Sequence, residues 1–161
     1  IMQRADALGY KGRYERVTPV VRETFDLEFM ARSTIGPHWA TLSADEQVRW
    51  VETFAGFTIS NFAERFDGFS GESFEILGRR PASRETVVVL TRLNWPDEDP
   101  VSLDYRMLET PAGWKIVDVY SGGSVSEVAL RRSEYAAVLK QGGIEKLIAS
   151  VSSKTAARAT P

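Results

Sequence analysis

The sequence contains no cysteine and a single histidine, His38. The lack of cysteine excludes disulfides, thiolate nucleophiles and cysteine-ligated metal sites. His38 has no second imidazole with which to share a metal, and no serine lies in a Gly-x-Ser-x-Gly turn. We therefore expect a structural or solvent-facing histidine, no metal or other cofactor, and no serine hydrolase.

The chain also lacks a strong charge of one sign and a long hydrophobic run. Its net charge is -2, and no basic tract supplies the concentrated positive field that nucleic acids require. No stretch of about 18 apolar residues is available to cross a membrane. The glycine-rich segments Gly9–Gly12 and Gly122–Gly123 do not have the spacing of a phosphate-binding loop.

The chain of 161 residues fits one domain, residues 1–161, without internal repeats. It starts at Ile1 within a helical pattern and without a charged and then apolar leader. We therefore expect that an N-terminal segment, including any signal peptide, is missing. The small, polar tail from Ser152 to Pro161 is expected to fray.

Helical periodicity governs the first part of the chain. The first predicted helix covers Gly12 to Phe25, with Pro19 bending or dividing it. Asp26 is expected to cap a short helix that continues to Ile35 and ends at Gly36-Pro37.

A long helix is predicted next, from a capping box formed by Ser43 and Glu46 to about Asp67. Two apolar stripes follow this helix and are rotated from each other. The first stripe is Val48, Val51, Ala55, Ile59, Phe62 and Phe66, and the second is Trp50, Phe54 and Phe57. A helix with two apolar sides is either a central core helix or one that lines a ligand cavity, and both alternatives stay open.

Alternating apolar residues then predict a meander of strands, before helical spacing returns. The four predicted strands are Glu72–Leu77, Glu85–Trp95, Val101–Glu109 and Gly113–Ser121. Short polar turns between them favour antiparallel neighbours. The helical segment after Gly123 is expected to end at Gly142-Gly143, with a final helix through Val151. Helices, then strands, then helices indicate an α+β domain.

Acidic residues are the remaining candidates for catalysis. Asp104 and Asp118 lie within predicted strands, where a buried carboxylate is either a tuned base or a structural group that anchors an arginine such as Arg92 or Arg106. The segment 113–119 is similar to the closing strand of NTF2-like small enzymes. An enzyme of that class with Asp118 as its base is therefore the alternative function.

Four segments in order resemble the MlaC family of periplasmic phospholipid-binding proteins, also called toluene-tolerance proteins. They are Phe25–Trp39, Leu42–Gln47 with the following Phe-rich helix, Val101–Met107 together with Gly113–Val119, and Gly123–Ile148. The resemblance covers about Val20 to Val151. The segment Gly122–Ser133 is closer to the hopanoid-associated HpnM branch, and it reads Gly-Ser-Val-Ser where typical members have Gly-Val-Ser.

The resemblance implies a fold and a function. The fold is a twisted, mainly antiparallel sheet of about four strands, wrapped by N- and C-terminal helices around an apolar pocket. The function is carriage of a phospholipid or hopanoid through the periplasm of the bacterial cell envelope, as a monomer and without enzymatic activity. The implied partners are an inner-membrane lipid transporter and an outer-membrane lipid complex.

By position, this resemblance also predicts lipid-binding residues, of which Phe62 and Val125 fall at or beside family pocket positions. The predicted residues are Phe29, Met30, Ile35, Trp39, Phe54, Ile59, Phe62, Phe66, Leu103, Tyr105, Met107, Val119, Val125 and Leu130. Each is equally compatible with an ordinary core position. An interaction module without a ligand is a third alternative, which a structure with no cavity above about 300 Å³ would favour.

Overall fold

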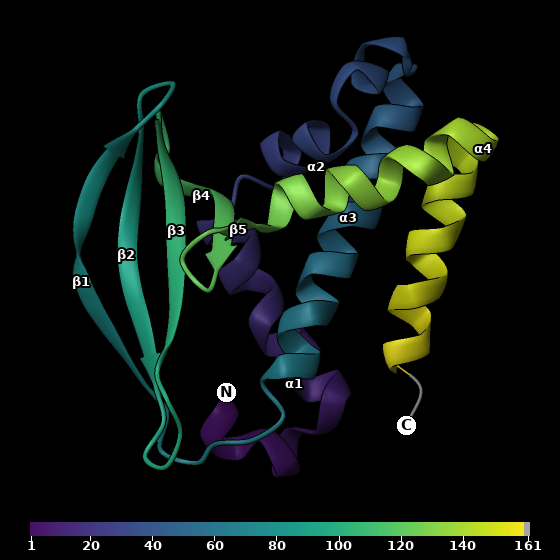
Figure 1. The fold of residues 1–161 in the computed structure, drawn as a ribbon. Coiled ribbons are helices and arrows are strands. Elements are labelled where there is room, and N and C mark those ends of the chain that lie inside the picture. The colour runs from purple at the N-terminus through teal and green to yellow at the C-terminus, as the bar shows by residue number, and fades with distance from the viewer. Residues whose placement is uncertain (160–161) are drawn as a thin grey trace.

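The computed structural model describes residues 1–159 as four α-helices beside one antiparallel sheet (Figure 1). The elements are η1 Met2–Arg4, α1 Ala5–Thr24, α2 Leu27–Ile35, η2 Gly36–Thr41, α3 Ala44–Arg65, β1 Ser73–Ala82, β2 Thr86–Asn94, β3 Val101–Thr110, β4 Gly113–Ser121, β5 Val125–Ser126 and α4 Glu127–Ala159. The α+β class is confirmed, with a two-residue fifth strand beyond the four that were predicted.

Two predicted helix caps are present and fix where α2 and α3 begin. The Asp26 carboxylate accepts a hydrogen bond from the Phe29 amide at 2.9 Å. At the start of α3, the Glu46 amide donates to the Ser43 hydroxyl while the Ser43 amide donates to the Glu46 carboxylate. Each cap satisfies backbone amides that the first helical turn leaves without partners.

Pro19, which was predicted to bend or divide the first helix, does not divide it. Pro19 lies within α1, and the only non-helical backbone inside this helix is at Gly9, whose φ is 57°. Pro19 and Glu15 are both exposed, so the carbonyl that loses its helical hydrogen bond is hydrated at the surface.

The expected fraying from Ser152 onwards is not seen in the residues that the structure describes. Helix α4 continues to Ala159, while Thr160 and Pro161 lie outside the described residues. The buried side chain of Val151 and an ion pair of 2.6 Å between Arg158 and Glu64 hold this last stretch against α3.

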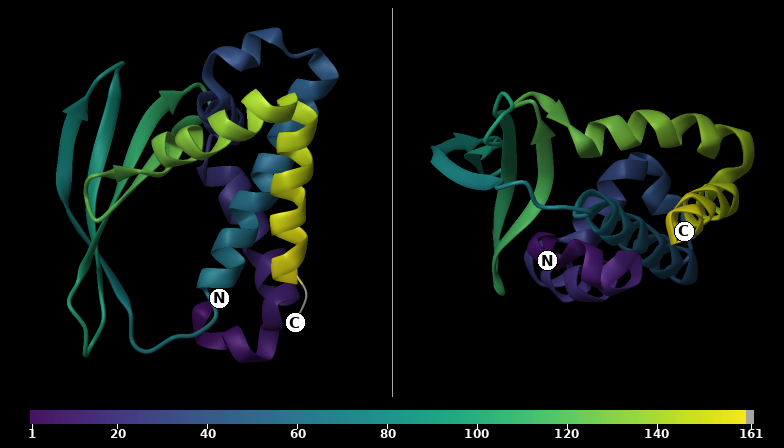
Figure 2. Two further views of the ribbon diagram at one scale, coloured as in Figure 1. Left: turned by 45° about the vertical axis from the view of Figure 1, so that its right-hand side comes forward. Right: turned by 90° about the horizontal axis from the view of Figure 1, so that it is seen from below.

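Helix α4 bends sharply where its end was predicted, at Gly142-Gly143. Gly143 has a φ of 66°, a conformation that side chains other than glycine rarely adopt. The first arm of α4 crosses α2 and α3, and the second runs alongside α3 (Figures 1 and 2).

The sheet is a meander in the order β1-β2-β3-β4-β5, with every neighbouring pair antiparallel. Strand β1 continues five residues past the predicted end at Leu77, because a bulge between Ile76 and Gly78 lets the chain keep its pairing with β2. The helices pack against β4 and β5, and the Asp26 amide donates to the Ile116 carbonyl at 2.9 Å. Strands β1 and β2 stand away from the helices in every view (Figures 1 and 2).

The main core lies among the helices and is centred on Trp50. The Trp50 indole is fully buried and donates to the Ala31 carbonyl at 2.9 Å. It also meets the ring of Tyr135 edge to face, with the centroids 5.4 Å apart. Of the two stripes predicted on α3, the one containing Trp50, Phe54 and Phe57 is entirely buried. In the other stripe, the prediction that Val48 faces inward is wrong, since this residue is 64% exposed.

Candidate functional site

A mainly apolar cavity of about 100 Å³ lies between α3, the sheet and the first turns of α4. Its lining residues are Phe25, Met30, Phe54, Phe57, Thr58, Asn61, Phe62, Arg65, Leu103, Tyr105, Val119, Ser121, Glu127, Val128 and Arg131. Aromatic rings form much of the wall, and Phe62 packs between Phe25 and Phe66 with centroids 5.5 Å and 5.7 Å away. Burial at this wall raises the pKa of the Tyr105 hydroxyl.

The sheet wall of the cavity continues beyond the part that the helices cover. Val119 is paired with Tyr105, and Tyr105 is paired with Val89, so these side chains share one face. The register carries the same face to Phe74 and Ile76 on β1, which are 57% and 75% exposed. The same face therefore runs from the cavity across the half-buried side chains of β2 to exposed apolar side chains at the edge of the sheet.

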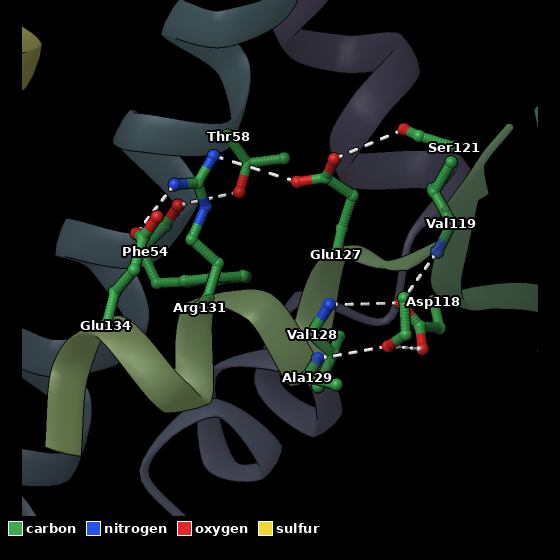
Figure 3. A network of polar contacts seen from close by, with 11 residues as sticks. Phe54, Thr58, Asp118, Val119, Ser121, Glu127, Val128, Ala129, Arg131 and Glu134 are labelled. Atoms are coloured by element: carbon green, nitrogen blue, oxygen red, sulfur yellow. Dashed lines mark hydrogen bonds and ion pairs between the residues drawn. The ribbon is translucent and has the colours of Figure 1, made fainter. Parts of the chain in front are cut away.

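Charged side chains of α4 close one side of the cavity (Figure 3). The Arg131 guanidinium pairs with Glu134 at 2.8 Å and with Glu127 at 3.6 Å. It also lies over the ring of Phe57, 5.1 Å from the centroid. Glu127 accepts a hydrogen bond of 3.2 Å from the Ser121 hydroxyl, so the network links α4 to the end of β4.

Asp118, the base in the alternative enzymatic hypothesis, does not line the cavity. Its carboxylate is 5% exposed and accepts hydrogen bonds from the Val119 amide at 2.8 Å, the Val128 amide at 3.1 Å and the Ser126 hydroxyl at 2.5 Å. These donors engage both carboxylate oxygens (Figure 3). The arrangement ties β4 to the N-terminus of α4 and leaves no free oxygen directed at a substrate.

Asp104 is likewise buried and structural, although it does not anchor Arg92 or Arg106 as the sequence suggested. Its carboxylate accepts from the Thr91 amide at 3.0 Å, which stabilises the join between β2 and β3. Arg92 instead pairs with Glu75 at 3.9 Å, and Arg106 donates to the Thr86 hydroxyl at 2.9 Å.

The described residues show neither a metal-binding cluster nor a membrane-spanning helix. His38 is exposed in η2, and no group of three or more metal-binding side chains gathers anywhere in residues 1–159. Within the same residues, no helix has both the length and the apolar character needed to cross a membrane.

A comparison with protein families decides the relationship of the chain. Residues 1–153 match the family described as MlaC protein. The chain belongs to the MlaC family. Comparison with curated protein sequences gives no significant match.

Among solved structures, this MlaC-family chain is similar to a phospholipid-binding protein from Ralstonia solanacearum, which was determined in complex with a phospholipid. The TM-score is 0.84 at 22% sequence identity, and the match covers 97% of this chain and 87% of the other. The two proteins therefore share a fold over nearly their whole lengths.

Within this MlaC fold, the structure brings six of the fourteen predicted residues together at the cavity and leaves eight outside it. The six are Met30, Phe54, Phe62, Leu103, Tyr105 and Val119. Of the others, Ile35 and Ile59 are buried in the core, while Trp39, Phe66 and Met107 are half-buried. Phe29, Val125 and Leu130 are exposed, Val125 to 51%.

Nine cavity residues of this MlaC-family chain were not predicted. They are Phe25, Phe57, Thr58, Asn61, Arg65, Ser121, Glu127, Val128 and Arg131. Six of the nine are polar, and a search for apolar stripes passes over them. Spacing of three and four residues from Phe54 leads to Phe57, Thr58, Asn61 and Arg65, so helical geometry alone would have found that side of the wall.

A larger groove lies on the opposite side of α3. It measures about 550 Å³, runs between α1, α3 and α4, and is lined by residues such as Tyr10, Tyr14, Gly56 and Thr155. Burial raises the pKa of the Tyr14 hydroxyl there. None of the fourteen predicted residues lines this groove.

Proposed function

We propose that this protein is a carrier that shelters the acyl tails of a phospholipid between α3 and the sheet, and that it catalyses no reaction. The observation that carries the proposal is the apolar sheet face that continues from the cavity to Phe74 and Ile76. Membership of the MlaC family and the fold shared with a phospholipid-binding protein support it. The engaged carboxylate of Asp118 argues against the enzymatic alternative.

The energetics of transfer explain why such a carrier is needed. Each methylene group removed from water contributes about 0.8 kcal/mol, so an acyl chain of about 16 carbons contributes roughly 13 kcal/mol. Crossing water without protection is therefore prohibitively slow for a membrane lipid. An apolar wall of Phe54, Phe57, Phe62 and Val119 offsets this penalty without any covalent step.

The size of the cavity indicates that the described conformation is a closed one. A cavity of about 150 Å³ holds one benzene molecule, whereas the cavity here measures about 100 Å³. It also falls below the roughly 300 Å³ usual for ligand sites, whereas the groove on the other side of α3 exceeds that size at about 550 Å³. An acyl tail therefore enters only if the walls separate, and the exposed apolar side chains of β1 are the surface that such a movement would add.

Lipid extraction from purified protein tests the proposal directly. Mass spectrometry of the extract is expected to find phospholipid in stoichiometric amount. Hopanoid in stoichiometric amount would identify a different cargo and would still support the carrier function. A clean extract, together with no uptake of added lipid, would contradict the proposal.

A matched pair of variants locates the lipid. Val119→Trp places a large ring in the cavity and should abolish lipid uptake while the protein stays folded. Val20→Trp adds the same ring at an exposed position of α1 and should leave uptake unchanged. Equal uptake by both variants would exclude the cavity as the binding site.

We further propose that the carrier works as a monomer in the periplasm, between an inner-membrane lipid transporter and an outer-membrane complex. The family relationship supports this location. Release of the protein by osmotic shock of intact cells tests the location. Crosslinking in the cell envelope, followed by identification of the captured membrane proteins, tests the partners.

A further inference from the structure

The last turn of α3 places a cation at the cavity without a counter-charge. Arg65 lines the cavity and is exposed, and its side chain makes no hydrogen bond or ion pair with any residue in 1–159. Asn61 lies one helical turn earlier on the same wall, and its amide is likewise without a partner among those residues. Two polar side chains with unused donors therefore face the same end of the cavity.

The other arginine of the cavity differs in its surroundings. Arg131 is neutralised by Glu127 and Glu134, at 3.6 Å and 2.8 Å. An anion that approached Arg131 would also meet these two carboxylates, and like charges brought together are strongly unfavourable. Arg65 forms no ion pair with any residue in the described part of the chain, so no paired carboxylate would repel an anion that binds to it.

The polar residues of the α3 wall lie toward its C-terminal end, although Phe62 stands among them. The residues that line the cavity run in the order Phe54, Phe57, Thr58, Asn61, Phe62 and Arg65. The eleven helical steps from Phe54 to Arg65 span roughly 16 Å at the helical rise of 1.5 Å per residue. An amphiphile that lies along α3 with its tails toward Phe54 would thus bring its polar group to Arg65.

We propose that Arg65, assisted by Asn61, binds the phosphate of the lipid headgroup and so makes the carrier selective for phosphate-bearing lipids. The inference rests on the proposed carrier function. The planar guanidinium of arginine donates two parallel hydrogen bonds to phosphate oxygens, and the amide of asparagine can add a third. An uncharged lipid with the same tails gains nothing from this pair of residues.

Binding of two lipids with identical tails tests the inference. The wild type, Arg65→Gln and the control Arg16→Gln are titrated with dipalmitoyl phosphatidylglycerol and with dipalmitoyl glycerol. Arg16 is also exposed and without an ionic partner in residues 1–159, but it lies on α1 outside the cavity. We expect Arg65→Gln to weaken phosphatidylglycerol binding about tenfold, while its diacylglycerol binding and both affinities of Arg16→Gln stay unchanged.

The outcomes separate the headgroup site from the carrier function. Equal effects of Arg65→Gln on both lipids, or no effect on either, overturn the role of Arg65 and leave the carrier function intact. Failure of the wild type to bind either lipid overturns the carrier function itself. Glycerol phosphate, added alone, should not bind measurably. Tight binding of this probe through Arg65 would show a site for free phosphate and would also overturn the inference. Circular dichroism confirms that the variants are folded.

Discussion

Tyr135 carries a buried hydroxyl that has no hydrogen-bond partner in residues 1–159, although only 3% of the residue is exposed. A buried hydroxyl without a partner is unfavourable, so the value of this tyrosine lies in its ring, which packs against Trp50. Burial raises the pKa of Tyr135 to about 12, from an ordinary value of 10.

The raised pKa of Tyr135 predicts how stability depends on alkaline pH. Between pH 10 and 12 the unfolded tyrosine loses its proton and the folded one retains it, so the unfolded state binds fewer protons and stability falls as pH rises. At pH 11 this difference in protonation lowers the free energy of unfolding by roughly 1 kcal/mol. Tyr135→Phe should be nearly neutral at pH 7 and should lose less stability than the wild type at pH 11, as measured by urea unfolding. Equal losses in both proteins would contradict the burial argument.

The Asp118 carboxylate predicts a structural effect rather than a catalytic one. Asp118→Asn replaces an acceptor oxygen with an amide donor, which faces the Val128 amide or the Ser126 hydroxyl that the carboxylate now accepts from. The expected loss is about 2–3 kcal/mol in urea unfolding, with lipid binding retained at temperatures where the variant is folded. Asp97→Asn, in the exposed loop between β2 and β3, should change stability by less than about 0.5 kcal/mol.

At the scale of elements, local chemistry predicted more than tertiary packing did. The caps at Asp26 and Ser43, the bend at Gly142-Gly143 and strand β4 all follow from a few neighbouring residues, and all are present. The second half of β1 was missed because Gly78 and Pro81 are typical of turns. Pairing with β2 overrides that local preference, and an edge strand tolerates proline because one side of it has no partner strand.

Alanine should have opposite effects at two glycines, one in the bend of α4 and one within α3. Gly143→Ala should destabilise the protein by about 1–2 kcal/mol, because the residue has a φ of 66° although space for a methyl group is available. Gly56→Ala, within α3, has ordinary helical geometry and a nearest contact of 3.8 Å to the Tyr14 hydroxyl. It should stabilise the protein by about 0.5–1 kcal/mol. Thermal unfolding of both variants measures the contrast, and changes of equal sign would contradict it.

At the scale of the whole molecule, the sheet holds exposed apolar side chains that folding alone does not require. Ile76 is 75% exposed on β1, where no helix covers it. Ile76→Ser should therefore leave the free energy of unfolding nearly unchanged while weakening lipid uptake several-fold. Val48→Ser, at a 64% exposed position on the outside of α3, should affect neither property. Lower stability with unchanged lipid uptake in Ile76→Ser would place the lipid elsewhere.

Sequence reasoning predicted only some of the residues that line the cavity, the candidate site. Phe54, Phe62 and Tyr105 lie at the cavity because apolar periodicity on α3 and β3 specifies which side faces inward. Val125 was selected by family position, yet it lies exposed on the two-residue strand β5. Arg65 and Glu127 were missed, because their places depend on how α3 and α4 meet the sheet, and no local pattern encodes that meeting.

The helices hold the sheet through β4 and β5, while β1 to β3 extend outward as a continuous meander from Ser73 to Thr110. The meander supplies Leu103 and Tyr105 to the cavity, whereas the core around Trp50 is built by the helices. A longer β1 or β2 would therefore enlarge the apolar surface beside the cavity and leave the helical core in place.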